Sequence, residues 1–116
     1  MWEYPCRAEA LPKPIMSFDL TQDIEVQNSV IKFTNLNLKK RGSGMVFWMQ
    51  WFLTDQDIVN TGPVTDVKIG QKIDWNMHHK QGVHFFVEKS EDVLINDVEV
   101  EVNFKQGEMA FNFSVL

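Results

Sequence analysis

The stretch DVEVEVNFKQGEMAFNFSVL, residues 97–116, decides the fold class, because apolar and polar side chains alternate along both of its halves. A period of two sends successive side chains to opposite faces of a strand, so that one face is buried and the other is solvated. Residues 105–108, KQGE, carry the glycine of a tight turn between the halves. We therefore predict an antiparallel hairpin with Glu99 and Glu101 on its solvated face. The predicted buried face consists of Val98, Val100, Val102, Phe104, Phe111, Phe113 and Val115.

The same alternation recurs upstream in short segments separated by turn residues, at 24–26, 31–38, 45–53, 64–69, 71–75 and 83–87. A slip of phase near Asn35 indicates a β-bulge in the second of these segments. Thr54, with Asp57 three residues later, has the pattern of a helix N-cap, and Gly62 would end a short helical turn. The pattern predicts an all-β fold, an antiparallel β-sandwich or barrel of about seven to eight strands with one short helical turn.

The segment MVFWMQWFL, residues 45–53, is apolar on both faces of its predicted strand. Such a strand is either covered on both sides within its own fold or meets another chain. Val46, Trp48 and Phe52 share one face, and the cores of protein–protein interfaces are rich in large apolar residues of this kind. We expect these three residues to form an interface in a homo-oligomer or in a complex with other structural proteins.

Residues 1–17 contain three prolines, at positions 5, 12 and 14. Proline lacks a backbone donor and has a fixed φ, so this segment is extended without being a central strand. The chain has 116 residues, which is the size of one ordinary domain. We predict an extended arm, residues 1–17, followed by a single β-domain, residues 18–116, and we expect Pro12 and Pro14 to contact a neighbouring subunit.

All three histidines lie in WNMHHKQGVH, residues 75–84. Alternating residues precede and follow this stretch, so its polar centre is interpreted as the tip of a hairpin. The alternative is a site for a soft metal ion such as Cu(I) or Ag(I), with Met77, His78, His79 and His84 as ligands. His78 and His79 are sequence neighbours and would point to opposite faces of a strand, which argues against chelation. The sequence therefore favours exposed loop histidines without a metal.

The formal net charge is −5 and the pI is about 5.1. Proteins that bind nucleic acid or anionic membranes non-specifically are basic, because contacts with phosphate supply most of their affinity. A nucleic-acid partner is therefore not expected, although nine Phe, four Trp and one Tyr keep an OB-type single-strand binder as an alternative. No apolar run approaches the ~20 residues of a membrane span. The expected location is the virion or the cytoplasm.

Sequence motifs of catalysis are absent, including G-x-S-x-G, H-E-x-x-H and a recognisable Cys–His pair. The single cysteine, Cys6, has no partner in the chain for a disulfide. We therefore predict that the protein is not an enzyme and needs no cofactor.

Three parts of the chain resemble small tail-associated structural proteins of tailed bacteriophages: a proline-rich start, a W-x-LT-D segment and a closing hairpin. The residues that match the first two parts are Leu11, Pro12, Pro14, Trp51, Leu53, Thr54 and Asp55. The resemblance implies a non-enzymatic virion component that assembles through arms and sheet edges. The sequence thus predicts a protein–protein assembly module, with the soft-metal binder and the single-strand binder as alternatives.

Overall fold

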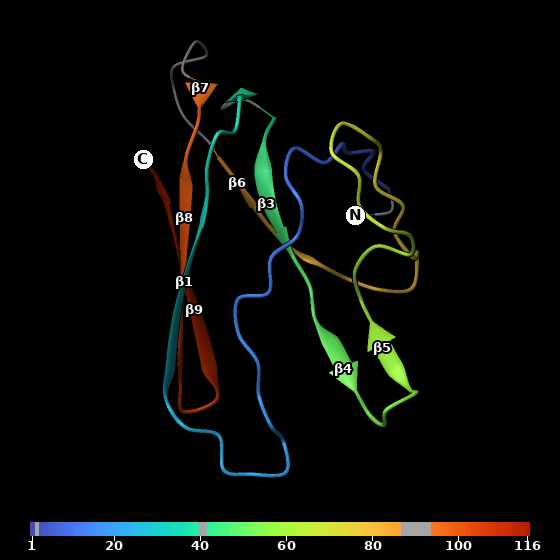
Figure 1. Cartoon of the computed structure of the whole chain (residues 1–116), viewed down its shortest axis with the longest axis vertical. Helices are drawn as coiled ribbons and strands as arrows, with labels where there is room; N and C mark the ends of the chain where they lie inside the picture. The colour runs from blue at the N-terminus through green and yellow to red at the C-terminus, as the bar shows by residue number, and fades with distance from the viewer. Residues whose placement is uncertain (2, 40–41, 87–93) are drawn as a thin grey trace. The chain divides into compact units, whose positions relative to one another are not determined.

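The computed structural model describes residue 1 and residues 3–39, 42–86 and 94–116 of the chain (Figure 1). This part of the chain contains nine strands and no helix, so the predicted all-β class is confirmed. No helix within these ranges is long and apolar enough to cross a membrane. The strands are β1 (Gln27–Phe33), β2 (Leu38–Lys39), β3 (Gly44–Phe47), β4 (Gln50–Phe52), β5 (Ile58–Asn60), β6 (Gly82–Phe85), β7 (Leu94–Ile95), β8 (Val98–Lys105) and β9 (Glu108–Val115).

The described chain divides into two compact units. The first consists of Met1–Leu11 and Leu38–Leu94, and the second of Pro12–Asn37 and Ile95–Leu116. Residues 1–17 therefore contribute to both units. Compact units are not by themselves folding domains, so the expected division into an arm and a single β-domain stays a prediction.

The second unit is built on an antiparallel sheet with the strand order β1-β8-β9. Val100, in the central strand, lies opposite Ile31 of β1 and Phe113 of β9. Between β8 and β9, Gln106 and Gly107 both have positive φ, as a two-residue type I′ turn requires. The predicted hairpin of residues 98–115 is therefore confirmed, and its period of two sets which side chains face the core.

Burial in this sheet decreases from its centre to its edge. Val98, Val100 and Val102 are buried, whereas Phe113 is half-buried because β9 pairs with β8 along one side only. On the opposite face, Glu101 accepts hydrogen bonds from the amides of Asn103 at 3.0 Å and Asn112 at 3.4 Å. The sheet therefore has an apolar face and a hydrogen-bonded polar face.

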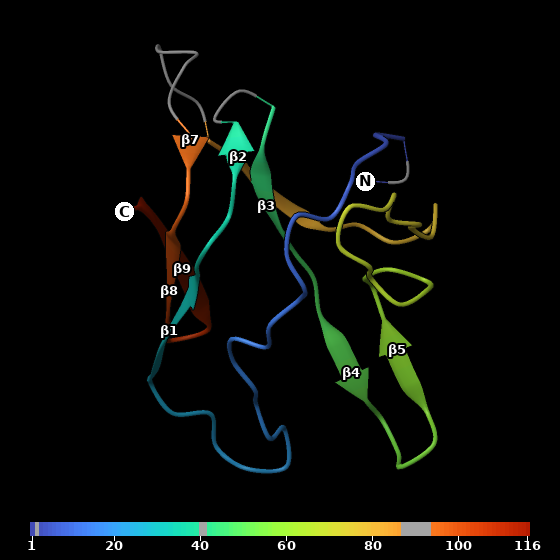
Figure 2. The same ribbon diagram turned by 45° about the horizontal axis from the view of Figure 1, so that its top comes forward.

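The slip of phase near Asn35 is a break in the ladder. β1 ends at Phe33, and Asn35 has a φ of 55°, which asparagine tolerates better than most residues. The backbone N–H of Asn35 donates to the carboxylate of Asp97, and that of Leu36 donates to Asn96 O at 2.8 Å. The chain then enters β2, which pairs with β7 (Figure 2).

In the first unit, residues 45–53 do not form the one continuous strand that the sequence predicts. The chain forms β3, which pairs with β6, and then β4, which pairs with β5. In Figure 1 the chain runs directly from β3 into β4. The β3–β6 ladder lies at one end of this run and the β4–β5 ladder at the other. Trp48 and Met49 lie between the two strands, and Met49 continues the β4–β5 pairing, since its N–H donates to Thr61 Oγ1 and its carbonyl accepts from Thr61 N at 3.0 Å.

The predicted helical turn after residue 53 is instead the turn of the β4–β5 hairpin. Thr54 Oγ1 does accept the backbone N–H of Asp57, at 3.0 Å, as a cap would. However, the N–H of Leu53 donates to Asp57 O at 2.9 Å, which closes the hairpin, and residues 58–60 are extended. The sequence therefore predicts the hydrogen bond of Thr54 correctly, but this bond lies in a hairpin turn and not at the start of a helix.

The N-terminal segment pairs with residues 70–73 over a short stretch. Ala8 N–H donates to Gln71 O, Gly70 N–H donates to Ala8 O, and Ile73 N–H donates to Cys6 O, at 2.7–3.0 Å. Ala8 is buried as a result. The predicted strands over residues 64–75 are therefore replaced by isolated bridges.

Candidate functional site

Two tryptophans, Trp48 and Trp75, form an aromatic pair in the first unit. Trp48 directly follows β3, and Trp75 forms a bridge with Pro63 just beyond β5. Their ring centroids are 5.7 Å apart at an angle of 79°, the edge-to-face arrangement that aromatic quadrupoles favour. The indole of Trp48 lies on the backbone of Gly62, where any Cβ atom would overlap it. We call Trp48, Thr61, Gly62, Trp75 and Gln81 the tryptophan cluster.

Gln81 ties the histidine-containing loop to the chain that follows β5. Its Nε2 donates to Thr61 O at 2.6 Å and to His79 O at 3.3 Å. Thr61 also bonds Met49 through its backbone and its hydroxyl. One glutamine therefore links the break between β3 and β4 with the loop that leads into β6.

Two polar atoms of the tryptophan cluster are buried and make no hydrogen bond within the described chain: Trp75 Nε1, a donor, and Gln81 Oε1, an acceptor. A buried polar group without a partner costs about 1–3 kcal/mol, and such groups are uncommon in native proteins. The tryptophan cluster therefore has one unsatisfied donor and one unsatisfied acceptor, and none of its side chains is acidic or basic.

The histidine stretch differs from the predicted hairpin tip. A turn is present, since His79 N–H donates to Asn76 O at 3.2 Å and His78 N–H donates to Asn76 Oδ1 at 2.8 Å. The flanking segments do not pair with each other: Trp75 bridges Pro63, and β6 pairs with β3. Val87, the end of the strand predicted to follow, lies outside the described residues.

The four possible metal ligands do not converge in the structure. Met77 and His78 are exposed, His79 is half-buried, and His84 lies in β6 opposite Met45. Within the described ranges, no group of three or more His, Cys, Asp or Glu side chains is arranged to hold a metal ion.

The expected interface residues lie in different surroundings. Val46 is half-buried in β3 opposite Val83, and Trp48 is half-buried in the tryptophan cluster. Phe52 is 70% exposed. Pro12 and Pro14 are exposed and belong to the second unit. Their role in an interface stays a prediction.

Trp75 and Gln81 were missed by the sequence-based prediction. Both stand in a polar stretch, and nothing in their spacing shows that they pack against residues far away in the sequence. The only sequence signal is a large aromatic residue at the end of an alternating segment, next to a loop.

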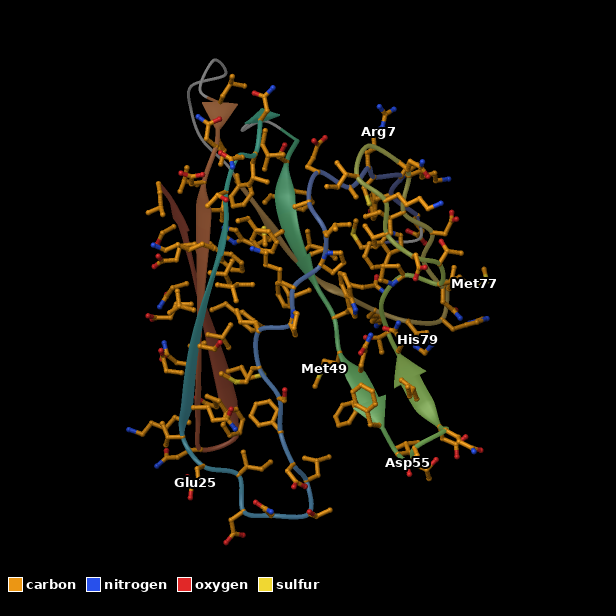
Figure 3. The ribbon with its side chains drawn as sticks, in the orientation of Figure 1. Arg7, Glu25, Met49, Asp55, Met77 and His79 are labelled. Atoms are coloured by element: carbon orange, nitrogen blue, oxygen red, sulfur yellow. The ribbon has the colours of Figure 1, made fainter. Side chains whose placement is uncertain are left out.

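The β4–β5 hairpin presents apolar side chains on both of its faces. Cross-strand pairs join Trp51 to Val59 and Phe52 to Ile58. Figure 3 shows Met49 at the start of this hairpin and Asp55 at its turn. The exposed side chains are Met49 (46%), Trp51 (39%), Phe52 (70%), Leu53 (67%), Ile58 (54%) and Val59 (40%). We call these six residues the hairpin surface.

No family model matches the chain, but the chain is similar to proteins whose names place them in one class, the enzymes that methylate arginine nitrogen. More particularly, the chain is similar to proteins named protein arginine N-methyltransferase 7. It is 36% identical to that of Danio rerio over 124 residues, 32% to that of Drosophila mojavensis over 119 and 32% to that of Gallus gallus over 124. These matches cover 99–100% of the chain but only 17–18% of each relative.

These relatives overturn several expectations. The resemblance to bacteriophage tail proteins is wrong, because the whole chain matches eukaryotic proteins. The expectation of a non-enzymatic structural subunit is wrong too, because the relatives are named as enzymes. Neither the soft-metal binder nor the single-strand binder receives support. Short motifs misled the prediction, since proline-rich starts and Leu-Thr-Asp segments occur in unrelated folds.

Proposed function

We propose that this chain is a β-strand segment of a protein arginine N-methyltransferase and that it serves methyl transfer to arginine side chains. The observation that carries the proposal is the similarity of 32–36% identity over 99–100% of the chain. Since the chain spans less than a fifth of those relatives, the activity belongs to a larger assembly of which this segment is one part.

The charge of the chain is consistent with this proposal. A guanidinium group is always cationic near neutral pH, and a protein surface of the opposite sign raises its local concentration. The chain carries 16 acidic and 11 basic residues, a net charge of −5. In the reaction, a guanidinium nitrogen bonds to the methyl carbon as the bond from that carbon to the donor breaks, and the nitrogen then releases a proton.

The relatives also bear on location. They are eukaryotic cellular proteins, so a cytoplasmic location is compatible with the comparisons and a virion location has no support.

The direct test is a methylation assay on the complete gene product. The protein is incubated with an isotope-labelled methyl donor and an arginine-rich peptide, and the hydrolysed peptide is examined for methylarginine. The matched control is the same peptide with lysine in place of every arginine. The proposal requires label in methylarginine and none in the lysine peptide. Absence of methylarginine under conditions in which the Danio rerio protein modifies the same peptide would overturn it.

A further inference from the structure

The two unpaired polar atoms of the tryptophan cluster have complementary chemistry. The indole Nε1 of Trp75 carries a hydrogen and can only donate, whereas Oε1 of Gln81 can only accept. Both atoms are buried, and neither makes a hydrogen bond within the described ranges. Buried polar groups in native proteins are nearly always paired, either with protein atoms or with ordered water. A single partner that both accepts and donates would satisfy the two atoms together.

The orientation of the Gln81 amide follows from its other hydrogen bonds. Its Nε2 donates to Thr61 O at 2.6 Å and to His79 O at 3.3 Å. If the amide were turned over, Oε1 would face two carbonyl oxygens, and acceptors cannot bond to one another. The unpaired atom of Gln81 is therefore its oxygen, and the partner of that oxygen must be a donor.

The chain that follows β5 brings the two side chains into one neighbourhood of the first unit. Gln81 bonds to Thr61 O, and Trp75 forms a bridge with Pro63, which lies close by in the sequence. Between these two contacts, the indole of Trp48 lies on the backbone and packs edge-to-face on the ring of Trp75. The donor and the acceptor therefore belong to side chains that contact the same short segment.

We propose that a buried water molecule bridges these two side chains, accepting a hydrogen bond from Trp75 Nε1 and donating one to Gln81 Oε1. Water is the smallest group that can do both, and buried waters typically make about three hydrogen bonds to groups that otherwise have no partner. This inference does not depend on the proposed function.

The chemistry of the two atoms excludes charged ligands at this site. A guanidinium or ammonium group has donors only and cannot accept from the indole. An ionised carboxylate has acceptors only and cannot donate to the amide oxygen. A peptide group has one of each, but it is larger than water and could reach these buried atoms only if the loop before Gln81 opened.

The proposed water closes the base of the histidine-containing loop, residues 76–80. Trp75 directly precedes this loop and Gln81 directly follows it. The segments that flank the loop do not pair with each other, because Trp75 bridges Pro63 and β6 pairs with β3. The water therefore supplies a link across the loop that a pair of strands would supply in an ordinary hairpin.

A crystal structure of the complete gene product, at a resolution that shows ordered water, tests the site directly. We expect density for one water at ~2.7–3.2 Å from both Trp75 Nε1 and Gln81 Oε1. A direct hydrogen bond between the two side chains would overturn the proposal. So would a protein group or a larger ligand in that place, or the absence of density between the two atoms.

Hydrogen exchange followed by mass spectrometry tests the link in solution, on the same complete gene product. Trp75→Phe keeps an aromatic ring and removes the indole N–H. We expect the amides of residues 76–80 to exchange roughly three- to tenfold faster, the effect of losing one hydrogen bond that resists local opening. Trp51→Phe is the matched control, because Trp51 is 39% exposed in β4, and it should leave the exchange of this loop unchanged.

The double variant separates the water bridge from a simple loss of packing. In a Gln81→Leu background the water has already lost its acceptor, so Trp75→Phe should give no further increase in the exchange of residues 76–80. An equal increase in both backgrounds would assign the effect to ring packing and overturn the proposal. No increase in Trp75→Phe alone would overturn it as well.

Discussion

The indole ring of Trp48 lies directly on the backbone of Gly62, and a side chain of any size at residue 62 would overlap it. Trp48 follows β3 and Gly62 follows β5, so this contact joins the β3–β6 ladder to the β4–β5 ladder. A glycine is needed here for space, and its φ does not lie in the left-handed region. The same relationship recurs between Phe47 and Gly82.

Replacing Gly62 with alanine should therefore destabilise the protein by overpacking. Forced rearrangements of this kind cost about 1–3 kcal/mol in the free energy of unfolding. Urea unfolding of Gly62→Ala, Trp48→Ala and the double variant measures the coupling between the two sites. We expect the alanine at position 62 to cost much less when Trp48 is absent. An equal cost in both backgrounds would show that the indole is not what Gly62 accommodates.

Gln81→Glu should be more damaging at neutral than at mildly acidic pH. The substitution replaces the Nε2 donor, which bonds Thr61 O at 2.6 Å, with a carboxylate oxygen that repels that carbonyl. Loss of such a bond to a part-buried carbonyl costs about 1–3 kcal/mol. A protonated glutamic acid can donate again, so stability relative to the parent should partly return as the pH falls. Gln81→Leu, which has no titrating group, is the control and should lack this additional pH dependence.

Val102→Ala and Val30→Ala form a matched pair in one sheet. Val102 is fully buried in β8, whereas Val30 is 44% exposed on the other face of β1. Val102→Ala removes the two buried γ-methyl groups and leaves a cavity, which should cost about 2–3 kcal/mol in the free energy of unfolding. The same substitution at residue 30 should stay within about 0.5 kcal/mol. Thermal or urea unfolding measures the free energy of unfolding of both variants. Similar costs would contradict the assignment of Val102 to the buried face of the sheet and of Val30 to the exposed face.

Asp19 should titrate below its ordinary range. The hydroxyl of Thr21 donates to its carboxylate at 2.6 Å and the backbone N–H of Thr21 does so at 3.0 Å, and these bonds lower the pKa of Asp19. A carboxyl group with a lower pKa in the folded state contributes stability above its unfolded pKa and loses it as the pH falls through the folded pKa. Thr21→Val removes the hydroxyl donor, so the pKa of Asp19 should rise toward its ordinary value. An NMR titration of the Asp19 side chain measures this, and an unchanged pKa would exclude the hydroxyl as the main cause.

The sequence predicted local features well and distant contacts poorly. The β8–β9 hairpin could be predicted because its alternation, its turn residues and its pairing all lie within one continuous stretch. The division of residues 45–53 into two strands could not, because it depends on the segments that pair with them, β6 with β3 and β5 with β4. Likewise, the packing of Trp48 on Gly62 and Trp75 arises from loops that meet only in the folded state.

Function was missed for a related reason. The similarity to proteins named as arginine methyltransferases is 32–36% identity over 99–100% of the chain, and a comparison of whole sequences reveals it. A search for catalytic spacings finds nothing in such a segment, and an aromatic strand such as residues 45–53 then suggests an interface instead.

The pairing of Ala8 with Gln71 also constrains the order of folding. Ala8 can be buried in this pairing only after Gln71, which lies far along the chain, has been synthesised. The second unit has the same property, because β1 can pair only after β8 has been synthesised. Pairings between distant segments are slow to form, since the entropy of loop closure is lost before any contact compensates for it. Neither unit can therefore close before its later segments have been synthesised, and the apolar side chains of β1 stay accessible to chaperones until β8 has emerged.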